Sequence, residues 1–186
     1  MEARPWSGRE VEGKRRFHSE TELRGFAASL GRLLRGGEVL GLVGALGVGK
    51  TVFTKGLAEG LEVPPSIPVT SPTFVLHRRY PGRLTLEHLD AYRLRSPVEL
   101  EALGLADLLE GPVVGGSRGA GPAVVVVEWA DKVVSLLPPR TIWIELDIID
   151  PTTRDLTCTI PNPDLTGMDL VRSLQALLSD APLSGT

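Results

Sequence analysis

The sequence has a single cysteine, no long hydrophobic run and no excess of positive charge. Because Cys158 is the only cysteine among 186 residues, no disulfide can form within the chain, and we expect a reducing compartment, the cytoplasm. No apolar stretch approaches the ~18–20 residues that cross a bilayer, and residues 1–16 lack the apolar segment of a signal peptide. The formal net charge of −3 provides no general basic field for nucleic acid. These absences predict a cytoplasmic protein that binds no membrane.

The first half of the chain shows clear helix and strand signals. Ser19 and Glu22 fit a capping box, which predicts a helix that ends at the Gly36-Gly37 pair. Residues 39–43 form a short apolar run of the buried-strand type. A further helix is expected from residue 50 to about residue 61, before two prolines.

The second half of the chain predicts a hairpin, more strands and two helices. Residues 66–73 are expected to form a loop, and residues 74–80 and 84–90 to pair across a Pro-Gly turn. The second capping box, Ser96–Glu99, predicts a helix that continues to Leu109. Further elements are expected as strands at 124–127, 141–149 and 153–160, and as a terminal helix at 168–178.

The residues between the first apolar strand and the following helix read G-A-L-G-V-G-K-T, which matches the phosphate-binding pattern G-x-x-x-x-G-K-[ST]. Glycines allow successive amide N–H groups to turn toward phosphate oxygens, and the helix directs its positive dipole end at them. Lys50 can reach the β- and γ-phosphates, and the Thr51 hydroxyl can bind magnesium. We therefore expect ATP and Mg²⁺ as cofactors, with nucleotide contacts from Gly44, Leu46, Gly47, Val48, Gly49, Lys50, Thr51 and Val52.

Two acidic residues at the ends of predicted strands are candidate partners of this loop. Glu128 follows four valines and is similar to the acid of a Walker B strand, with glutamate in place of aspartate. Asp90 can hold the water shell of magnesium or orient an attacking water. Ser71 and Thr73 can contact the γ-phosphate as switch segments do. The alternative interpretations are solvated carboxylates and an ordinary turn.

Three other residues are interpreted as structural. His88 lies close to a strand, where a single histidine is more often structural than catalytic. Trp129 is expected to be an aromatic residue of the core or of a cleft wall, and Cys158 a small buried residue that is not a nucleophile.

The order of the elements predicts an α/β fold, a single-domain P-loop NTPase. We expect a central, mostly parallel sheet with an antiparallel hairpin and with helices on both faces. Residues 1–17 would be a loose leader or a first strand, and residues 18–162 the ATPase domain with a flexible loop at 111–123. Residues 163–186 would be a helix and tail of the same domain.

Several motifs follow one another in a characteristic order between residues 17 and 160. They are S-E-T-E-L at Ser19–Leu23, the loop at Gly44–Thr51, S-P-T at Ser71–Thr73, H-L-D-A-Y-R-L at His88–Leu94, E-L-x-x-L-G at Glu99–Gly104 and V-E-W at Val127–Trp129. With this combination the chain resembles the bacterial TsaE (YjeE) ATPases, which act in threonylcarbamoyl-adenosine modification of tRNA.

The resemblance implies weak ATP hydrolysis and work with two partners, transferase subunits of the TsaD and TsaB type. These transfer threonylcarbamoyl to adenosine in tRNAs that read codons beginning with A. The chain would meet tRNA through that complex rather than directly, and alone it would be a monomer or self-associate weakly.

The resemblance also implies roles for individual residues. It implies that Thr51 and Glu128 hold magnesium and that Asp90 is needed for hydrolysis. Glu20, before the first helix, and Arg154, on the last hairpin, match family residues that contact nucleotide.

The phosphate loop departs from the family pattern at two positions. Ala45 stands where the family usually has aspartate, and Val52 where it usually has threonine. Both changes leave Lys50, Thr51 and the backbone donors in place, so they concern turnover and its control by partners more than nucleotide binding.

Three other nucleotide-dependent functions share a phosphate loop of this kind. A GTPase is disfavoured because the guanine-reading N-K-x-D motif is absent from the sequence. A non-hydrolysing module that only senses nucleotide is disfavoured by Asp90 and Glu128. A small-molecule kinase stays open, since such enzymes close an arginine-rich lid over phosphates. Candidate lid residues are Arg78, Arg79, Arg83, Arg93 and Arg95.

Overall fold

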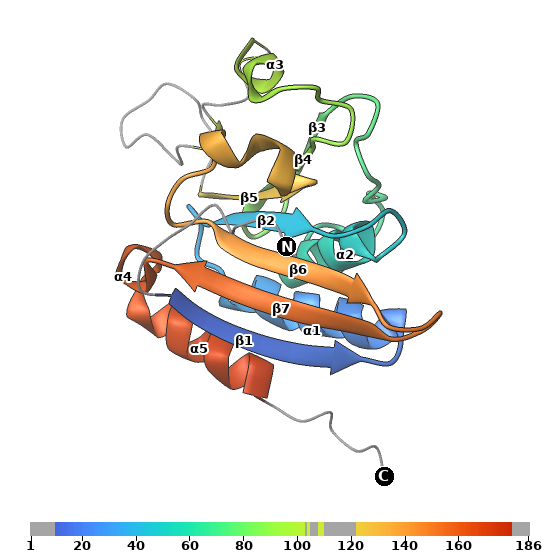
Figure 1. The fold of residues 1–186 in the computed structure, drawn as a ribbon, viewed down its shortest axis with the longest axis vertical. Coiled ribbons are helices and arrows are strands. Elements are labelled where there is room, and N and C mark those ends of the chain that lie inside the picture. Colours follow the sequence, from blue (N-terminus) through green and yellow to red (C-terminus); the bar gives the residue numbers. More distant parts are fainter. Residues whose placement is uncertain (1–9, 103, 105–107, 110–121, 180–186) are drawn as a thin grey trace.

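The computed structural model describes residues 10–102, 104, 108–109 and 122–179 (Figure 1). Strands and helices alternate along most of this length. In chain order they are β1 (Glu10–Phe17), α1 (Glu20–Leu33), β2 (Val39–Val43), α2 (Lys50–Gly60), β3 (His77–Tyr80), β4 (Thr85–Asp90), α3 (Pro97–Ala102), β5 (Ala123–Glu128), η2 (Ala130–Leu136), β6 (Ile142–Ile148), β7 (Arg154–Pro161), α4 (Pro163–Thr166) and α5 (Met168–Ser179). None of these helices is long and apolar enough to cross a membrane.

The seven strands form one sheet in the order β1-β7-β6-β2-β5-β4-β3. Its four central strands, β6, β2, β5 and β4, are parallel neighbours. Antiparallel pairing extends this centre on both sides, with β7 and β1 beyond β6 and with β3 beyond β4. The α/β class with a mostly parallel centre is therefore confirmed, and residues 10–17 of the expected leader form the strand β1.

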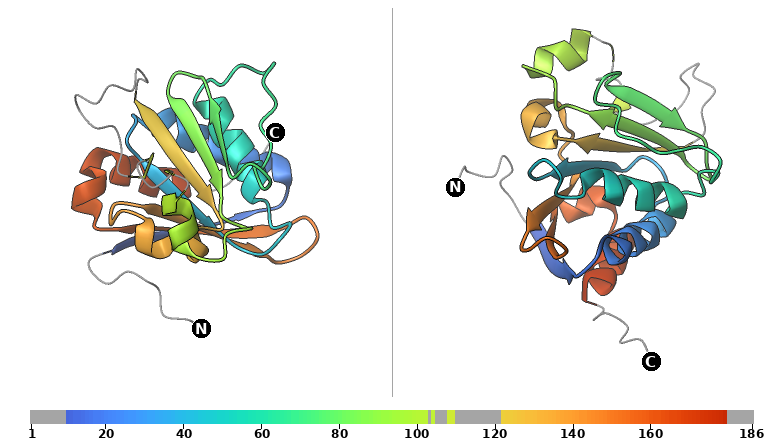
Figure 2. Two further views of the ribbon diagram at one scale, coloured as in Figure 1. Left: turned by 90° about the horizontal axis from the view of Figure 1, so that it is seen from above. Right: turned by 90° about the vertical axis from the view of Figure 1, so that its right-hand side faces the viewer.

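Alternate residues of the central strands fill two separate cores, one on each face of the sheet. Leu40, Leu42 and Val126 pack against α1, α2 and α5. Val39 and Val127 point the other way and pack with residues of η2 and of the segment around α3. Because both faces are covered, β2 and β5 are apolar at nearly every position. Figure 2 shows the helices on the two sides of the sheet.

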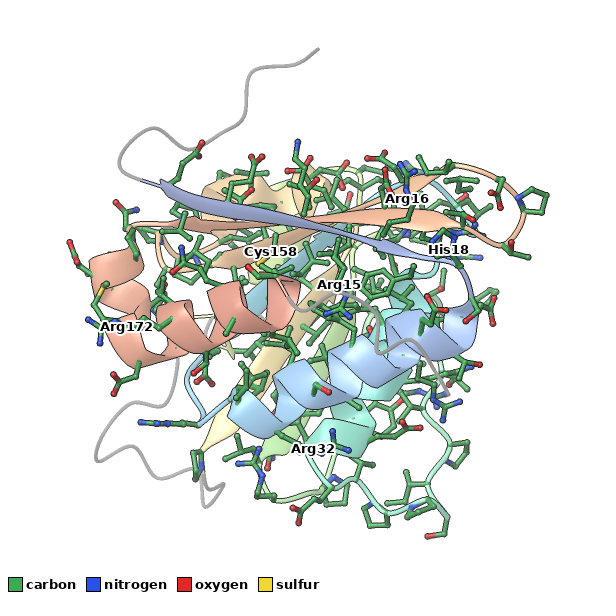
Figure 3. All side chains as sticks on the ribbon, turned by 90° about the horizontal axis from the view of Figure 1, so that it is seen from below. Arg15, Arg16, His18, Arg32, Cys158 and Arg172 are labelled. Atoms are coloured by element: carbon green, nitrogen blue, oxygen red, sulfur yellow. The ribbon has the colours of Figure 1, made fainter. Side chains whose placement is uncertain are left out.

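The first face also carries α5, which packs against β1 beside α1 (Figure 3). Arg15 of β1 lies where the two helices meet. Its guanidinium donates to the carbonyl oxygen of Leu177 at 2.6 Å and lies 5.6 Å from the ring centroid of Phe26. Cys158 is buried on the same face. The terminal helix is thereby tied to the first strand.

Helices α1 and α2 approach each other closely through three glycines. A Cβ added to Gly31 would lie 2.7 Å from the carbonyl oxygen of Leu57 and 2.9 Å from the Cα of Gly60. Cβ atoms at Gly56 and Gly60 would likewise meet the backbone of α1. Since α2 begins at the end of the phosphate loop, this contact fixes the position of that loop over the sheet.

Two elements are several residues shorter than predicted, whereas β5, β6 and β7 differ from the prediction by one residue at each end. The strand expected over residues 74–80 begins only at His77, because Phe74 and Val75 lie in a turn and Leu76 has a left-handed φ of 63°. The helix expected to reach Leu109 ends at Ala102, and Gly104 follows in a turn with φ of 67°. Leu103 and Ala106 of that prediction lie outside the described residues.

Other parts of the sequence prediction were incomplete. The short helices η2 and α4 were not expected. Ala123, expected in the loop at 111–123, instead opens β5, while residues 111–121 lie outside the described part of the chain.

Candidate functional site

The glycine-rich loop joins β2 to α2 at the carboxyl end of the parallel strands. Gly47 and Gly49 have φ of 77° and 116°, values that L-residues with side chains rarely adopt. Gly49 is the N-cap residue of α2 and offers no side-chain cap. The first amide groups of α2 therefore have no side-chain acceptor, which is the arrangement that binds an anion at a helix N-terminus.

Lys50, the first residue of α2, is buried and turned back onto the loop. Its Nζ donates to the carbonyl oxygens of Gly44 and Ala45 at 2.7 and 2.9 Å. It also lies 3.7 Å from the ring centroid of Trp129, close enough for a cation–π contact. Burial lowers the pKa of Lys50, and the nearby charge of Glu128 opposes this shift.

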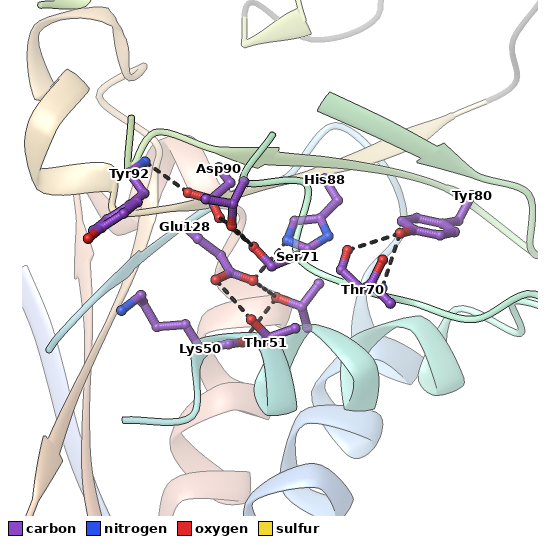
Figure 4. A network of polar contacts seen from close by, with 11 residues as sticks. Lys50, Thr51, Thr70, Ser71, Tyr80, His88, Asp90, Tyr92 and Glu128 are labelled. Carbon is purple, nitrogen blue, oxygen red and sulfur yellow. Dashed lines mark hydrogen bonds and ion pairs between the residues drawn. The ribbon is translucent and has the colours of Figure 1, made fainter. Parts of the chain in front are cut away.

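Glu128, the last residue of β5, lies beneath the first turn of α2 and is 2% exposed. Its Oε2 accepts a hydrogen bond from Thr51 Oγ1 at 3.1 Å. Its Oε1 lies 2.9 Å from His88 Nε2 and 3.5 Å from Thr54 Oγ1 (Figure 4). The structure thus places the predicted Walker B acid against the threonine that follows Lys50.

Asp90 ends β4 and is the register partner of Glu128 on β5. Its Oδ2 accepts hydrogen bonds from Ser71 Oγ and, at 2.8 Å, from Thr73 Oγ1. Its Oδ1 accepts from the amide of Tyr92 at 2.8 Å. Asp90 thus forms one cluster with Ser71 and Thr73, which precede it by 19 and 17 residues. Asp90 and Ser71 lie beside the Glu128 network (Figure 4).

The remaining predicted nucleotide residues lie around the loop. Arg154 Nε donates to the carbonyl oxygen of Val48 at 2.9 Å, and its other guanidinium nitrogens bond carbonyl oxygens of the β6–β7 turn. Leu46 is 74% exposed on the loop. Glu20 and Val52 line a hollow of about 430 Å³ between the first half of α1 and the side of α2 that carries Val52, Lys55 and Glu59. Arg154 is thus bonded to the loop itself, while Glu20 stands apart from the carboxylate network.

The oxygen atoms at this site fit magnesium shared with a nucleotide. Within the described residues, no group of three or more His, Cys, Asp or Glu side chains could hold a metal by itself. Mg²⁺ favours oxygen ligands and usually keeps several waters while bound by one or two protein groups and by phosphates. Thr51 Oγ1 and the Glu128 carboxylate, 3.1 Å apart beside the phosphate loop, provide such a partial set.

Two members of the network were not predicted as site residues. Thr54 follows Thr51 by three positions, a spacing that puts both hydroxyls on one face of α2. His88 precedes Asp90 by two positions, so both side chains lie on one face of β4. The two periodicities were available in the sequence, but they identify a face and not a contact.

Comparisons with known proteins agree with the geometry. The model of the threonylcarbamoyl adenosine biosynthesis protein TsaE matches residues 17–156. The chain is 42% identical over 128 residues to the tRNA threonylcarbamoyladenosine biosynthesis protein TsaE of Treponema pallidum, covering 69% of this chain and 86% of that protein. The corresponding protein of Bacillus subtilis is 39% identical over 124 residues, covering 66% of this chain and 70% of that protein.

Among solved structures, the crystal structure of Bacillus subtilis YdiB is similar to this one. The TM-score is 0.65 at 28% sequence identity, and the match covers 92% of this chain and 97% of YdiB. The family match, the relatives and the fold together show that this chain belongs to the TsaE family of tRNA threonylcarbamoyladenosine biosynthesis, a family of nucleotide-binding proteins.

Proposed function

We propose that this chain is a magnesium-dependent ATPase of the cytoplasm, required for forming the threonylcarbamoyl group on tRNA adenosine. It would act with transferase subunits of the TsaD and TsaB type and meet tRNA through their complex. The observation that carries the ATPase proposal is the contact between Thr51 and Glu128, which brings a phosphate loop and a strand-end acid together.

Nucleotide binding rests on the loop and on Lys50. The uncapped amides at the start of α2 and the helix dipole favour the phosphates. The ammonium of Lys50 contacts two loop carbonyl oxygens, and a phosphate oxygen is a stronger, charged acceptor for the same donor. Burial lowers the pKa of Lys50. The negative charge of a bound phosphate would act in the opposite direction and favour the protonated lysine.

Thr51 and Glu128 are the residues that would hold magnesium. The metal, when bound, neutralises negative charge on the β- and γ-phosphates. Thr51 Oγ1 can bond Glu128 through its proton and still offer lone pairs to a cation. Glu128 thus orients Thr51 as well as supplying charge.

Asp90 is proposed to orient the attacking water. Both of its carboxylate oxygens already accept hydrogen bonds, from Ser71, Thr73 and the amide of Tyr92. Oδ2 already accepts two hydrogen bonds, so a water molecule that bonds this oxygen would compete with the segment at Ser71–Thr73. Such competition would make hydrolysis by the chain alone slow and would give partner proteins a means of control.

Three of the candidate lid arginines have other partners in the structure. Arg79 pairs with Glu87 on the neighbouring strand, and Arg83 donates to the carbonyl oxygens at the end of α1. Arg93 lies over the ring of Phe74, 4.1 Å from its centroid. These engagements favour the ATPase over the small-molecule kinase.

The test is phosphate release from ATP by the purified chain, alone and with its transferase partners and tRNA. We expect slow release that the partners change, and loss of release in Lys50→Ala and Asp90→Ala. The control is Lys14→Ala, which removes an exposed lysine on β1. Normal hydrolysis by either site variant would refute the assignment. Phosphoryl transfer to a metabolite, with no response to the partners, would support the kinase, and nucleotide binding without any hydrolysis would support a sensing module.

A further inference from the structure

His88 is a fully buried histidine in the core between β4 and α2, with 0% of its surface exposed. It lies opposite Val126 in the sheet register, among apolar neighbours. Its Nε2 contacts Glu128 Oε1 at 2.9 Å, while Nδ1 is buried without a hydrogen-bond partner in the described part of the chain. An unpaired buried polar atom costs free energy, on the order of 1–3 kcal/mol. Because this cost would be avoided by an apolar residue at position 88, we looked for a role of His88 other than packing, in its contact with Glu128.

The chemistry of the pair fixes which atom donates. An ionised carboxylate only accepts hydrogen bonds, so His88 Nε2 carries the proton and donates it to Glu128 Oε1. Thr54 Oγ1 approaches the same oxygen at 3.5 Å. Thr54 has a single hydroxyl proton, which it donates to the nearer carbonyl oxygen of Lys50 at 3.1 Å, so His88 is the donor that holds Oε1. Oε2 is left facing Thr51 Oγ1. The two oxygens of one carboxylate therefore have separate surroundings (Figure 4).

This division matters because the acid is glutamate. A glutamate side chain has one more rotatable bond than aspartate, so its carboxylate can take more orientations at the end of a strand. A donor on a neighbouring strand restricts that freedom. His88 is on β4 and Glu128 on β5, and the parallel pairing of these strands sets the distance between them.

We propose that His88 is a positioning residue for the metal site, holding Glu128 Oε1 so that Oε2 and Thr51 Oγ1 face one magnesium ion together. This inference rests on the proposed function, since it assigns a role toward the metal of that site. Removing a group that hydrogen-bonds a metal ligand and orients it typically weakens metal affinity by roughly 10–100-fold. Nucleotide binding without metal depends instead on the loop amides and Lys50, which His88 does not touch.

The experiment measures two quantities for each variant. The first is the affinity for a fluorescent ADP analogue in EDTA, and the second is the Mg²⁺ concentration that gives half of the metal-dependent change in binding. The variants are His88→Leu, which removes the donor, and His88→Gln, whose amide can place an N–H near the position of Nε2. The control is His77→Leu, because His77 makes a similar contact with Glu87, at 2.7 Å, on the edge hairpin. We expect all variants to bind the analogue in EDTA within about twofold of the wild type. For His88→Leu, the Mg²⁺ concentration at half-saturation should rise by about 10-fold or more. For His88→Gln, the rise in this concentration should be smaller.

A wild-type magnesium dependence in folded His88→Leu would overturn the proposal, and so would an equal change in the His77 control. If His88→Leu does not fold, His88→Gln is compared with His88→Asn, whose shorter amide reaches only toward the Nδ1 position. The proposal requires the glutamine variant to respond to magnesium more like the wild type, and equal responses refute it. Failure of the wild-type chain to bind the analogue at all would instead refute the proposed function.

Discussion

Replacing Gly31 with alanine tests whether the close contact of α1 and α2 is required. In an exposed helix interior, glycine to alanine stabilises by about 0.5–1 kcal/mol. At Gly31 the new Cβ would lie 2.7 Å from the carbonyl oxygen of Leu57, whereas ordinary contact begins at 3.4 Å. One helix must therefore retreat by about 0.7 Å, and neither contacting atom belongs to a flexible side chain. Overpacking of this kind costs about 1–3 kcal/mol. The middle of that range exceeds the middle of the propensity gain, so we expect a net loss of about 1 kcal/mol.

The assay is urea unfolding followed by circular dichroism, with Gly25→Ala as the matched control. Gly25 lies in the same helix, and a Cβ there would meet nothing within 4 Å. That variant should gain about 0.5–1 kcal/mol, because only helix propensity changes. The two alanine substitutions are thus expected to have opposite signs. If Gly31→Ala were as stable as the wild type, or if both variants shifted alike, the backbone contact would not be the constraint we describe.

Three further predictions concern other parts of the chain. Burial raises the pKa of the Cys158 thiol to about 12, so a thiol reagent should label the native protein negligibly at pH 8 and the urea-unfolded chain fully. Hydrogen bonds from Thr153 and the amide of Thr152 lower the pKa of Asp150 to about 2 from 3.8. The stabilisation from the ionised Asp150 is therefore present above pH 3.8 and lost as the pH falls toward 2. In Asp150→Asn, the free energy of unfolding should fall less steeply with pH between pH 3.8 and 2 than in the wild type. Tyr80→Phe removes two hydrogen bonds to the backbone of Thr70 and should speed hydrogen exchange at that amide, with a cost of about 1 kcal/mol in unfolding free energy.

Elements with strong signals at both ends were predicted well from the sequence. β2 occupies the predicted residues 39–43, bounded by the Gly36-Gly37 pair and by the phosphate loop. α5 runs from Met168 to Ser179, against a prediction of 168–178. In contrast, the capping box at Ser96 fixes only where a helix begins, and α3 ended after six residues. Gly104, which adopts a left-handed φ, was the signal for that end.

In the candidate site, too, some features could be predicted from the sequence and others could not. The loop residues were predicted together because they are contiguous and their chemistry depends on a short spacing. The contact of His88 with Glu128 joins residues 40 positions apart, and it depends on β4 pairing in parallel with β5. No local pattern states which strands are neighbours, so the sequence could place both residues at the right edge without showing that they touch.

The pairing of β1 with β7 has a consequence for how the chain is made. Among the described strands, β1 is synthesised earliest and its partner β7 last, and the two pair from Phe17 with Arg154 to Glu10 with Pro161. Until then β1 and the outer edge of β6 expose unpaired backbone groups, which other chains could pair with. Arg154, on the late strand, is also the residue that bonds Val48 in the phosphate loop. Synthesis of β7 is therefore needed both to complete this side of the sheet and to supply the arginine that bonds the nucleotide loop.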